Sequence, residues 1–318
     1  MSAAPITCLA QCRNHELFVT SLRDIEKALA PQEAVNVLAK LLSEYHEFAS
    51  LFSWEKSDKL PSHCPYDHII PLISDKELLK EPLYNMSCDE LQVLQKYLKD
   101  HLSKGFIHAS SSSAAFSVIF IKKPEGELCL CVNYRDLNNL TVKNQYSLPL
   151  IWETLNLMTS SVIFTKLDII TAFNKLRMTE REEWKTAMQT YYSLFEYLVM
   201  LFELCEASSF FQSYINDILQ DCLDVFVTTY IDDILIFSKS KKEYQKHVHT
   251  VLTKLQGAGL QLNIEKCEFH VKEVKYLRLI IAKREIQMNS VKISVIVNWK
   301  ALICVKDIQS FLGFVNFY

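Results

Sequence analysis

The chain has little of what usually makes turns. Its 318 residues include only five glycines and eight prolines, and no proline follows Pro149. This content is sparse for a large chain that must turn many times. Hydrophobic residues make up 49% of the sequence, which is ample for a real core. We therefore predict a globular protein of one elongated domain or two.

A basic excess is also missing. Lys and Arg number 34 against 37 Asp and Glu, so the formal net charge is -3. Phosphate contacts come from Lys and Arg, and a nucleic-acid binder with this composition needs its basic residues clustered.

No membrane span is evident in the sequence either. The most apolar stretch, residues 194–211, carries Glu196, Glu203 and Glu206, which a spanning helix would not tolerate cheaply.

The ten cysteines form no regular framework, and no signal peptide precedes them. This pattern indicates reduced thiols and an intracellular location, with no legible signal for a compartment. Two small groups could be imagined as metal ligands, but neither completes a four-ligand pattern. These groups are Cys8, Cys12 and His15, and Cys129 with Cys131.

The stretch Asp224 to Ser238 carries the strongest chemical signal. Two runs rich in β-branched and aromatic residues flank Asp232 and Asp233, which predicts a β-hairpin with both acids at or beside its tip. Two-residue hairpin turns favour Asn-Gly or Asp-Gly, so Ile-Asp-Asp is a poor choice for folding alone. Adjacent carboxylates repel unless a cation lies beside them, and Mg²⁺ accepts one or two carboxylates plus substrate phosphates. A solvated turn that merely carries two acids is the other interpretation.

A second apolar strand, Val162 to Asp168, also ends in an acid. Two strands that deliver carboxylates to one edge of a sheet can hold two metal ions. That arrangement can activate a 3′-hydroxyl and steady a leaving pyrophosphate.

Several further motifs occur in a fixed order around these acids. They are LCVNYRDLN (Leu130 to Asn138), FEYLVM (Phe195 to Met200) and FLGFVNFY (Phe311 to Tyr318). Together they resemble the reverse transcriptase of long-terminal-repeat retrotransposons of the Ty3/gypsy type, and the similarity runs colinearly from Lys59 to Tyr318. The resemblance implies an α+β fold shaped as a right hand, with fingers, a palm built on an antiparallel sheet, and a truncated thumb.

The resemblance divides the chain and assigns its catalytic residues. Residues 1–58 are expected to be a helical extension, and residues 59–318 the polymerase domain. The fingers would span about 100–145 and 176–206, the palm about 146–175 and 207–288, and the partial thumb 289–318. Asp168 and Asp232 would bind two Mg²⁺ ions with help from the Ile169 carbonyl, while Asp233 supports the site.

Substrate contacts follow from the same resemblance. Lys123 matches a fingers lysine that contacts the triphosphate, and Phe173 matches an aromatic that excludes a ribose 2′-hydroxyl. Gln212 would lie near the template, or else be an ordinary exposed helix glutamine. In the last helix, Gln309, Gly313 and Phe317 would follow the duplex minor groove, or this helix is simply amphipathic. The implied partners are an RNA or DNA template with its primer, and deoxynucleoside triphosphates. No membrane partner is implied, and the oligomeric state stays open.

Several positions depart from the family pattern. Cys129 replaces an arginine that binds the triphosphate, and Asn133 replaces a fingers aspartate. Positions that usually hold glycine carry Ser193, Glu203, Glu206 and Arg278, while Leu201 and Ser208 replace prolines. A glycine position that needs positive φ would be strained by its replacement. Two functions therefore stay open, which are a working RNA-directed DNA polymerase and an inactive relic that at most binds nucleic acid.

The remaining pattern predicts the main elements. A capping box at Ser87 to Glu90 begins a helix that ends before Gly105. Strands are expected at 116–122 and 128–133, and helices at 211–222 and 243–256. A second hairpin is expected at 274–281 and 285–288, followed by two short helices. Within the extension we predict helices at 21–30 and 33–48.

Overall fold

The computed structural model describes residues 36–73, 78, 80–122, 128–277, 279–283, 285–288, 290–299 and 303–315. Its contacts divide the chain into two compact units. The described part of the first unit lies in Asp58–Asn144 and Phe173–Ala207, and the second comprises Asn36–Ser57, Gln145–Ala172 and Ser208–Tyr318. Within the described residues, no helix is long and apolar enough to cross a membrane.

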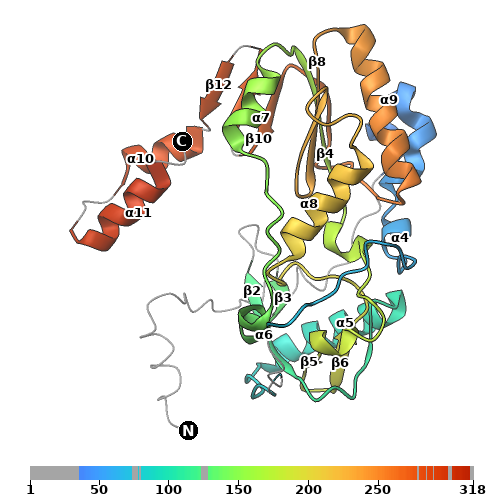
Figure 1. The fold of residues 1–318 in the computed structure, drawn as a ribbon, viewed down its shortest axis with the longest axis vertical. Helices are drawn as coiled ribbons and strands as arrows, with labels where there is room; N and C mark the ends of the chain where they lie inside the picture. Colours follow the sequence, from blue (N-terminus) through green and yellow to red (C-terminus); the bar gives the residue numbers. More distant parts are fainter. Residues whose placement is uncertain are drawn as a thin grey trace. The chain divides into compact units, whose positions relative to one another are not determined.

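Helix α5 (Cys88–Lys104) of the first unit follows the local sequence signals closely (Figure 1). The Ser87 hydroxyl accepts the Glu90 N–H, and the Glu90 carboxylate accepts the Ser87 N–H. Gly105 ends the helix with a φ of 73°. Val93, Leu94 and Leu98 are buried on the inner face. The predicted capping box and glycine stop are both confirmed.

The sheet of the first unit has the strand order β1-β6-β5-β2-β3. The long hairpin of β2 (Phe116–Lys122) and β3 (Leu128–Val132) confirms the two strands predicted there. The other strands are short, namely β1 (Ile107–Ala109), β5 (Met188–Gln189) and β6 (Leu194–Tyr197). The short helices α6 (Arg135–Leu140) and η3 (Glu183–Thr186) belong to the same unit, and η2 (Ala172–Lys175) begins in the second unit and continues into the first.

An antiparallel sheet, ordered β7-β8-β4-β9, forms the centre of the second unit. Its strands are β7 (Val227–Tyr230), β8 (Asp233–Ser238), β4 (Ile163–Asp168) and β9 (Glu268–Val271). Helix α9 (Lys241–Gly257) packs on β4 and β8 (Figure 1). Helix α8 (Ala207–Ile218) carries the buried side chains of Phe211 and Ile215. Helix α7 (Ile151–Met158) adds Leu155 and Met158 to the core around Phe164.

The described end of the predicted extension contributes to this second unit. The predicted helix at 33–48 is wrong as a single helix, because Leu41 adopts extended geometry with a ψ of 135°. A short α3 (Val37–Lys40) is followed by the 3₁₀ helix η1 (Ser43–Phe52) and by α4 (Trp54–Ser57). Aromatic pairs attach η1 to the unit, with ring centroids 5.6 Å apart for Tyr45 and Phe269 and 5.0 Å apart for Phe48 and His249. The predicted helix at 21–30 lies outside the described residues.

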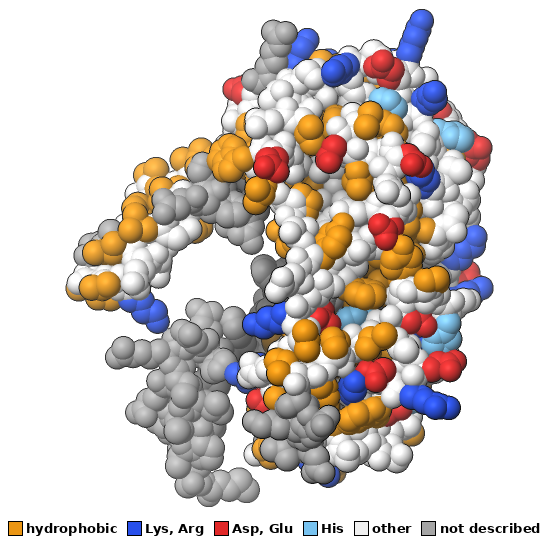
Figure 2. Space-filling view, in the orientation of Figure 1, with side chains coloured by type: hydrophobic (Ala, Val, Ile, Leu, Met, Phe, Trp, Pro, Cys, Tyr) orange, Lys and Arg blue, Asp and Glu red, His pale blue; other side chains and the backbone are white. Residues whose placement is uncertain are grey.

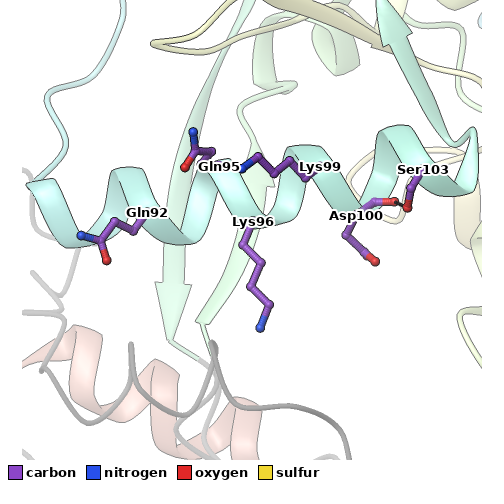
Figure 3. A pocket seen from close by; sticks show the side chains of 6 residues that line it. All are labelled: Gln92, Gln95, Lys96, Lys99, Asp100 and Ser103. Carbon is purple, nitrogen blue, oxygen red and sulfur yellow. Dashed lines mark hydrogen bonds between the residues drawn. The ribbon is translucent and has the colours of Figure 1, made fainter.

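The second predicted hairpin also differs. What we predicted as one strand at 274–281 is two, β10 (Glu273–Tyr276) and β11 (Leu279–Ala282), because Leu277 takes a left-handed φ of 50°. With β12 (Glu285–Met288) they form a three-stranded antiparallel sheet. The two predicted helices follow as α10 (Ser290–Val297) and α11 (Val305–Val315). Figure 2 shows many hydrophobic side chains on these two helices, and the exposed ones include Val297, Val305 and Leu312.

Candidate active site

The tip of the β7–β8 hairpin holds two of the predicted acids. Tyr230 pairs with Asp233, so Ile231 and Asp232 form a two-residue loop. Ile231 has a φ of 56°, whereas Asp232 is not among the residues with positive φ. Positive φ at the first loop residue alone is the pattern of a type II′ turn, where glycine is preferred. The hairpin is confirmed, and its tip is built from a residue that the turn disfavours.

Asp168 lies at the same edge of the sheet. In the β4–β8 ladder it is directly opposite Asp233, and the Ile169 N–H donates to the Asp232 carbonyl over 3.3 Å. Directly opposed like charges destabilise a sheet. The structure therefore brings together Asp168, Asp232, Asp233 and Ile169, all within the second unit.

Two lysines, which the sequence reasoning missed, lie beside these acids. Lys166 Nζ is 2.9 Å from Asp233 Oδ1, and Lys266 Nζ is 3.6 Å from Asp168 Oδ2. The alternation of a strand could have found Lys166, because it lies two residues before Asp168 and so on the same face. Nothing local in the sequence links Lys266 to Asp168.

Burial and mutual repulsion change the acidity of this edge. Burial, reinforced by the charges of Asp232 and Asp233, raises the pKa of Asp168 to about 6, although Lys266 and Lys166 oppose the shift. Burial likewise raises the pKa of Asp232. Both carboxyls hold their negative charge at a free-energy cost, which a bound cation would offset.

The donor set fits Mg²⁺ in part. Carboxylate oxygens are the ligands that Mg²⁺ prefers, and burial disfavours the charged form of Asp168, a cost that a bound cation would offset. Among the described residues, however, no three His, Cys, Asp or Glu side chains are grouped as a ready metal cage. Mg²⁺ often takes only one or two carboxylates and completes its shell with water and substrate phosphates. The acidic edge suits that kind of shared site.

Comparison with known proteins decides the family. Residues 121–281 match the family model described as "Reverse transcriptase (RNA-dependent DNA polymerase)", which is half of the chain. The chain belongs to the reverse transcriptase family. Curated relatives include the Tf2-3 and Tf2-7 transposon polyproteins of Schizosaccharomyces pombe, which are 35% and 34% identical over 274 residues. These alignments cover 86% of this chain but only 21% of each relative, so the chain spans about a fifth of their length. The predicted resemblance to Ty3/gypsy-type elements is confirmed.

Solved structures confirm the fold. A foamy viral protease-reverse transcriptase in complex with double-stranded DNA aligns with a TM-score of 0.75 at 19% identity, over 95% of this chain and 63% of that one. The same viral protein in complex with an RNA/DNA hybrid aligns with a TM-score of 0.69, over 96% of this chain and 41% of that one. The predicted α+β polymerase fold is therefore confirmed for the reverse transcriptase domain.

Gln212 lies inside the reverse transcriptase domain, on α8. Its side chain is 0% exposed, so the alternative of an exposed helix glutamine is wrong. Its Oε1 accepts the N–H of Ile231 over 2.7 Å. The sequence showed only a polar residue on a helix, and could not show that the helix passes beneath the hairpin tip.

The structure places the other predicted contact residues on different elements. Phe173 is half-buried in η2, within the first unit. Gln309 and Gly313 are exposed on α11, and a Cβ built on Gly313 meets no atom within 4 Å. Lys123 and Phe317 lie outside the described residues.

The unusual residues of the domain are accommodated locally. Asn133 Nδ2 donates to both carboxylate oxygens of Glu81 over 3.1 and 3.2 Å, and its Oδ1 accepts the Arg135 Nε–H over 2.8 Å. An aspartate at 133 would instead face the Glu81 charge. The strain considered for Glu203 and Glu206 is absent, because neither has positive φ, and the same holds for Ser193. Arg278 and the side chain of Cys129 lie outside the described residues.

A glutamate in place of the usual glycine at position 206 nevertheless carries a cost. It is only 5% exposed, and burial raises the pKa of its carboxyl. A buried carboxylate is disfavoured unless it is compensated. The backbone tolerates the glutamate, and a hydrogen bond from the backbone of Asn144 offsets part of the cost of burying its charge.

Proposed function

We propose that this domain catalyses RNA-directed DNA synthesis, adding deoxynucleotides to a primer 3′-hydroxyl under the direction of a template. One observation carries the proposal, which is the meeting of Asp168, Asp232 and Asp233 at one sheet edge. Membership of the reverse transcriptase family supports it. Because its curated relatives are transposon polyproteins about five times as long as the matched region, the domain would act within a retrotransposon polyprotein inside the cell.

Asp168 and Asp232 would hold two Mg²⁺ ions, assisted by the Ile169 carbonyl, and Asp233 would support them. Bound there, Mg²⁺ supplies a lowered pKa for the primer hydroxyl and neutralises charge on the triphosphate. The protein contributes the ladder that fixes Asp168 opposite Asp233, and Lys166 and Lys266 partly neutralise the Asp233 and Asp168 carboxylates while no metal is bound. Holding reactants in a fixed geometry supplies a large part of the rate of such a transfer.

Substrate selection would fall to residues of the first unit and of α11. Lys123 would contact the triphosphate, and Phe173 would exclude a ribose 2′-hydroxyl. Gln309, Gly313 and Phe317 would follow the minor groove of the duplex, and the open space around Gly313 supports close approach of a nucleic-acid backbone. In this proposal, fingers, palm and a partial thumb keep the boundaries predicted from the sequence.

The second candidate is an inactive relic that at most binds nucleic acid. The buried Glu206 favours it, as does Glu203, because both add negative charge to a protein whose ligands would be polyanions. On the face in Figure 2, Lys and Arg are interspersed with Asp and Glu and form no single basic patch. This candidate retains the fold and loses the chemistry.

Primer extension separates the two candidates. A DNA primer on a homopolymer RNA template, with Mg²⁺ and a labelled deoxynucleotide, should be extended by the wild-type domain. Asp232→Asn keeps the size of the side chain and removes its charge, so extension should fall at least a thousandfold. Folded wild-type protein that extends no primer would overturn the proposal and favour the relic. Restoring Arg at 129 and Gly at 203 and 206 then tests whether those substitutions caused the loss.

A further inference from the structure

A chain of hydrogen bonds runs from the exposed Tyr146 hydroxyl, through the half-buried Asn216 and the buried Thr229 and Gln212, to the hairpin tip. Gln212 Nε2 donates to Asn216 Oδ1 and to Thr229 Oγ1, each over 2.8 Å. Thr229 Oγ1 donates to Asn216 Oδ1 over 2.6 Å, and Asn216 Nδ2 donates to the Tyr146 hydroxyl over 2.8 Å. The amide orientation of Gln212 is thereby fixed, because its two donor hydrogens already have acceptors. Its Oε1 is left to accept the N–H of Ile231.

Ile231 is an unfavourable residue for the conformation that it adopts. A β-branched residue at positive φ is a genuine outlier, and its backbone is strained. Residues in such conformations persist only where their surroundings hold them. The Gln212 amide contacts the backbone of Ile231 itself, which makes it the direct restraint on this residue.

The conformation of Ile231 sets the direction of the residues that follow. Asp232 is the next residue, and Asp233 begins β8 opposite Asp168. A change of φ at Ile231 would rotate the Asp232 carbonyl, which accepts the Ile169 N–H at the end of β4. The turn therefore connects Gln212 to all three acids through backbone alone.

We infer that Gln212 is a positioning residue, which keeps Ile231 left-handed and so aims Asp232 and Asp233. The inference rests on the proposed polymerase function, but it assigns Gln212 a role inside the protein in place of a template contact. The side chain is fully buried, and each of its polar atoms is engaged by Asn216, Thr229 or Ile231. Little of the amide remains for a nucleotide.

The test is a double-mutant cycle between Gln212 and Ile231. Gln212→Met keeps the length of the side chain and removes both ends of the amide. With the wild-type Ile231 in place, we expect Gln212→Met to lower kcat for primer extension roughly tenfold to a hundredfold, with KM for primer-template unchanged. In an Ile231→Gly background, positive φ costs nothing, so the same change should lower kcat less than about threefold.

Thr165→Val is the matched control. It removes a different buried hydrogen bond of the same unit, between Thr165 Oγ1 and the Tyr244 hydroxyl, on the opposite face of β4. It should lower stability without changing kcat. An equal loss of kcat for Gln212→Met in both backgrounds would overturn the inference, and so would a raised KM for primer-template with kcat unchanged.

Hydrogen exchange gives a readout that needs no activity. In Gln212→Met, the backbone amides of residues 230–233 should exchange at least tenfold faster, whereas in Thr165→Val they should keep the wild-type rate. Unchanged exchange at the tip in Gln212→Met overturns the positioning role even if the wild-type domain proves inactive. An inactive wild type with faster exchange in Gln212→Met would instead overturn the proposed function and support the positioning role.

Discussion

Two residues of this protein, Gly105 and Ile231, adopt left-handed backbone for opposite reasons. Gly105 ends α5 with a φ of 73°, and glycine reaches that region without steric cost. Ile231 opens the β7–β8 turn with a φ of 56°, where a β-branched side chain is strained. The first position obeys the local rule of folding, and the second breaks it immediately before two acids.

The surroundings of the two residues repeat this difference. Around Gly105, the capping box and the buried face of α5 all favour the same helix. Around Ile231, like charges meet across a ladder, and burial raises the pKa of Asp168 to about 6. Proteins tend to break local rules at functional sites and compensate elsewhere. The comparison therefore predicts that substitution of Gly105 destabilises the protein, whereas substitution of Asp168 or Ile231 stabilises it or changes its stability little.

The largest effect is expected at Asp168. In metal-free protein at pH 7.5, Asp168→Asn should raise the free energy of unfolding by about 2 to 3 kcal/mol, because it removes a charge that the fold disfavours. The folded pKa is higher than the unfolded one, so the cost is fully present above about pH 6 and disappears as pH falls toward about 3.9. Urea denaturation between pH 5 and 8 should show the gain shrinking by roughly half at pH 5. A gain that stays constant across this range would contradict the account.

At the helix end, Gly105→Ala should lower the free energy of unfolding by about 1 to 2 kcal/mol, with primer extension unchanged. Space is not the cause, since a Cβ there would meet Leu60 Cδ2 at an ordinary 3.8 Å. Gly257→Ala is the control, because Gly257 lies at the end of α9 without positive φ and with no atom within 4 Å of a new Cβ. That change should raise stability by roughly 0.5 to 1 kcal/mol. Equal effects at the two glycines would remove the basis of the comparison.

Lys166 should matter more than Lys266. Lys166 is 19% exposed and lies 2.9 Å from the Asp233 carboxylate, whereas Lys266 is 64% exposed and lies 3.6 Å from Asp168. We expect Lys166→Met to lower metal-free stability by about 1 kcal/mol, and Lys266→Met by under about 0.5 kcal/mol. Divalent cations should bind Lys166→Met more tightly by isothermal titration, because a competing cation is gone. Weaker binding would mean that the lysine instead helps to form the metal site.

Ile231→Gly should change stability least, by under about 0.5 kcal/mol, because relief of backbone strain offsets the lost side-chain contacts. Ile163→Gly is the matched control, since Ile163 is also half-buried but lies in the regular strand β4. The control should lose roughly 2 kcal/mol or more by thermal unfolding. If both variants lose the same amount, Ile231 is not strained.

The sequence predicted the secondary-structure elements that depend on capping residues, turn residues and hydrophobic periodicity. The α5 capping box, the β7–β8 hairpin and the existence of α8 follow from spacing and turn chemistry, although α8 begins and ends four residues earlier than the predicted 211–222. The sequence did not predict the contacts that form between residues far apart in the chain. Lys266 reaches Asp168 only through the path of the chain between α9 and β9, and Gln212 is buried only because α8 passes beneath the tip. Leu277 divided a predicted strand because an apolar run alone does not reveal a left-handed turn.

The substitutions of the family pattern at Asn133 and Glu203 show the same limit of prediction from sequence. Sequence reasoning treated them as losses, but the contact of Asn133 depends on Glu81, which lies 52 residues away. The strain considered for Glu203 depended on a φ that only the structure gives. A substitution can be judged as damage only after its new partners are known.

The most direct test of the acidic edge is to count bound Mn²⁺ by electron paramagnetic resonance. The wild-type domain would carry a chain-terminated primer on its template and a non-hydrolysable deoxynucleotide, beside Asp232→Asn as the control. We predict two ions per wild-type chain and at least one fewer in the variant. Equal numbers in the two proteins would show that Asp232 holds no metal, and would contradict the assignment of this edge as a two-metal site.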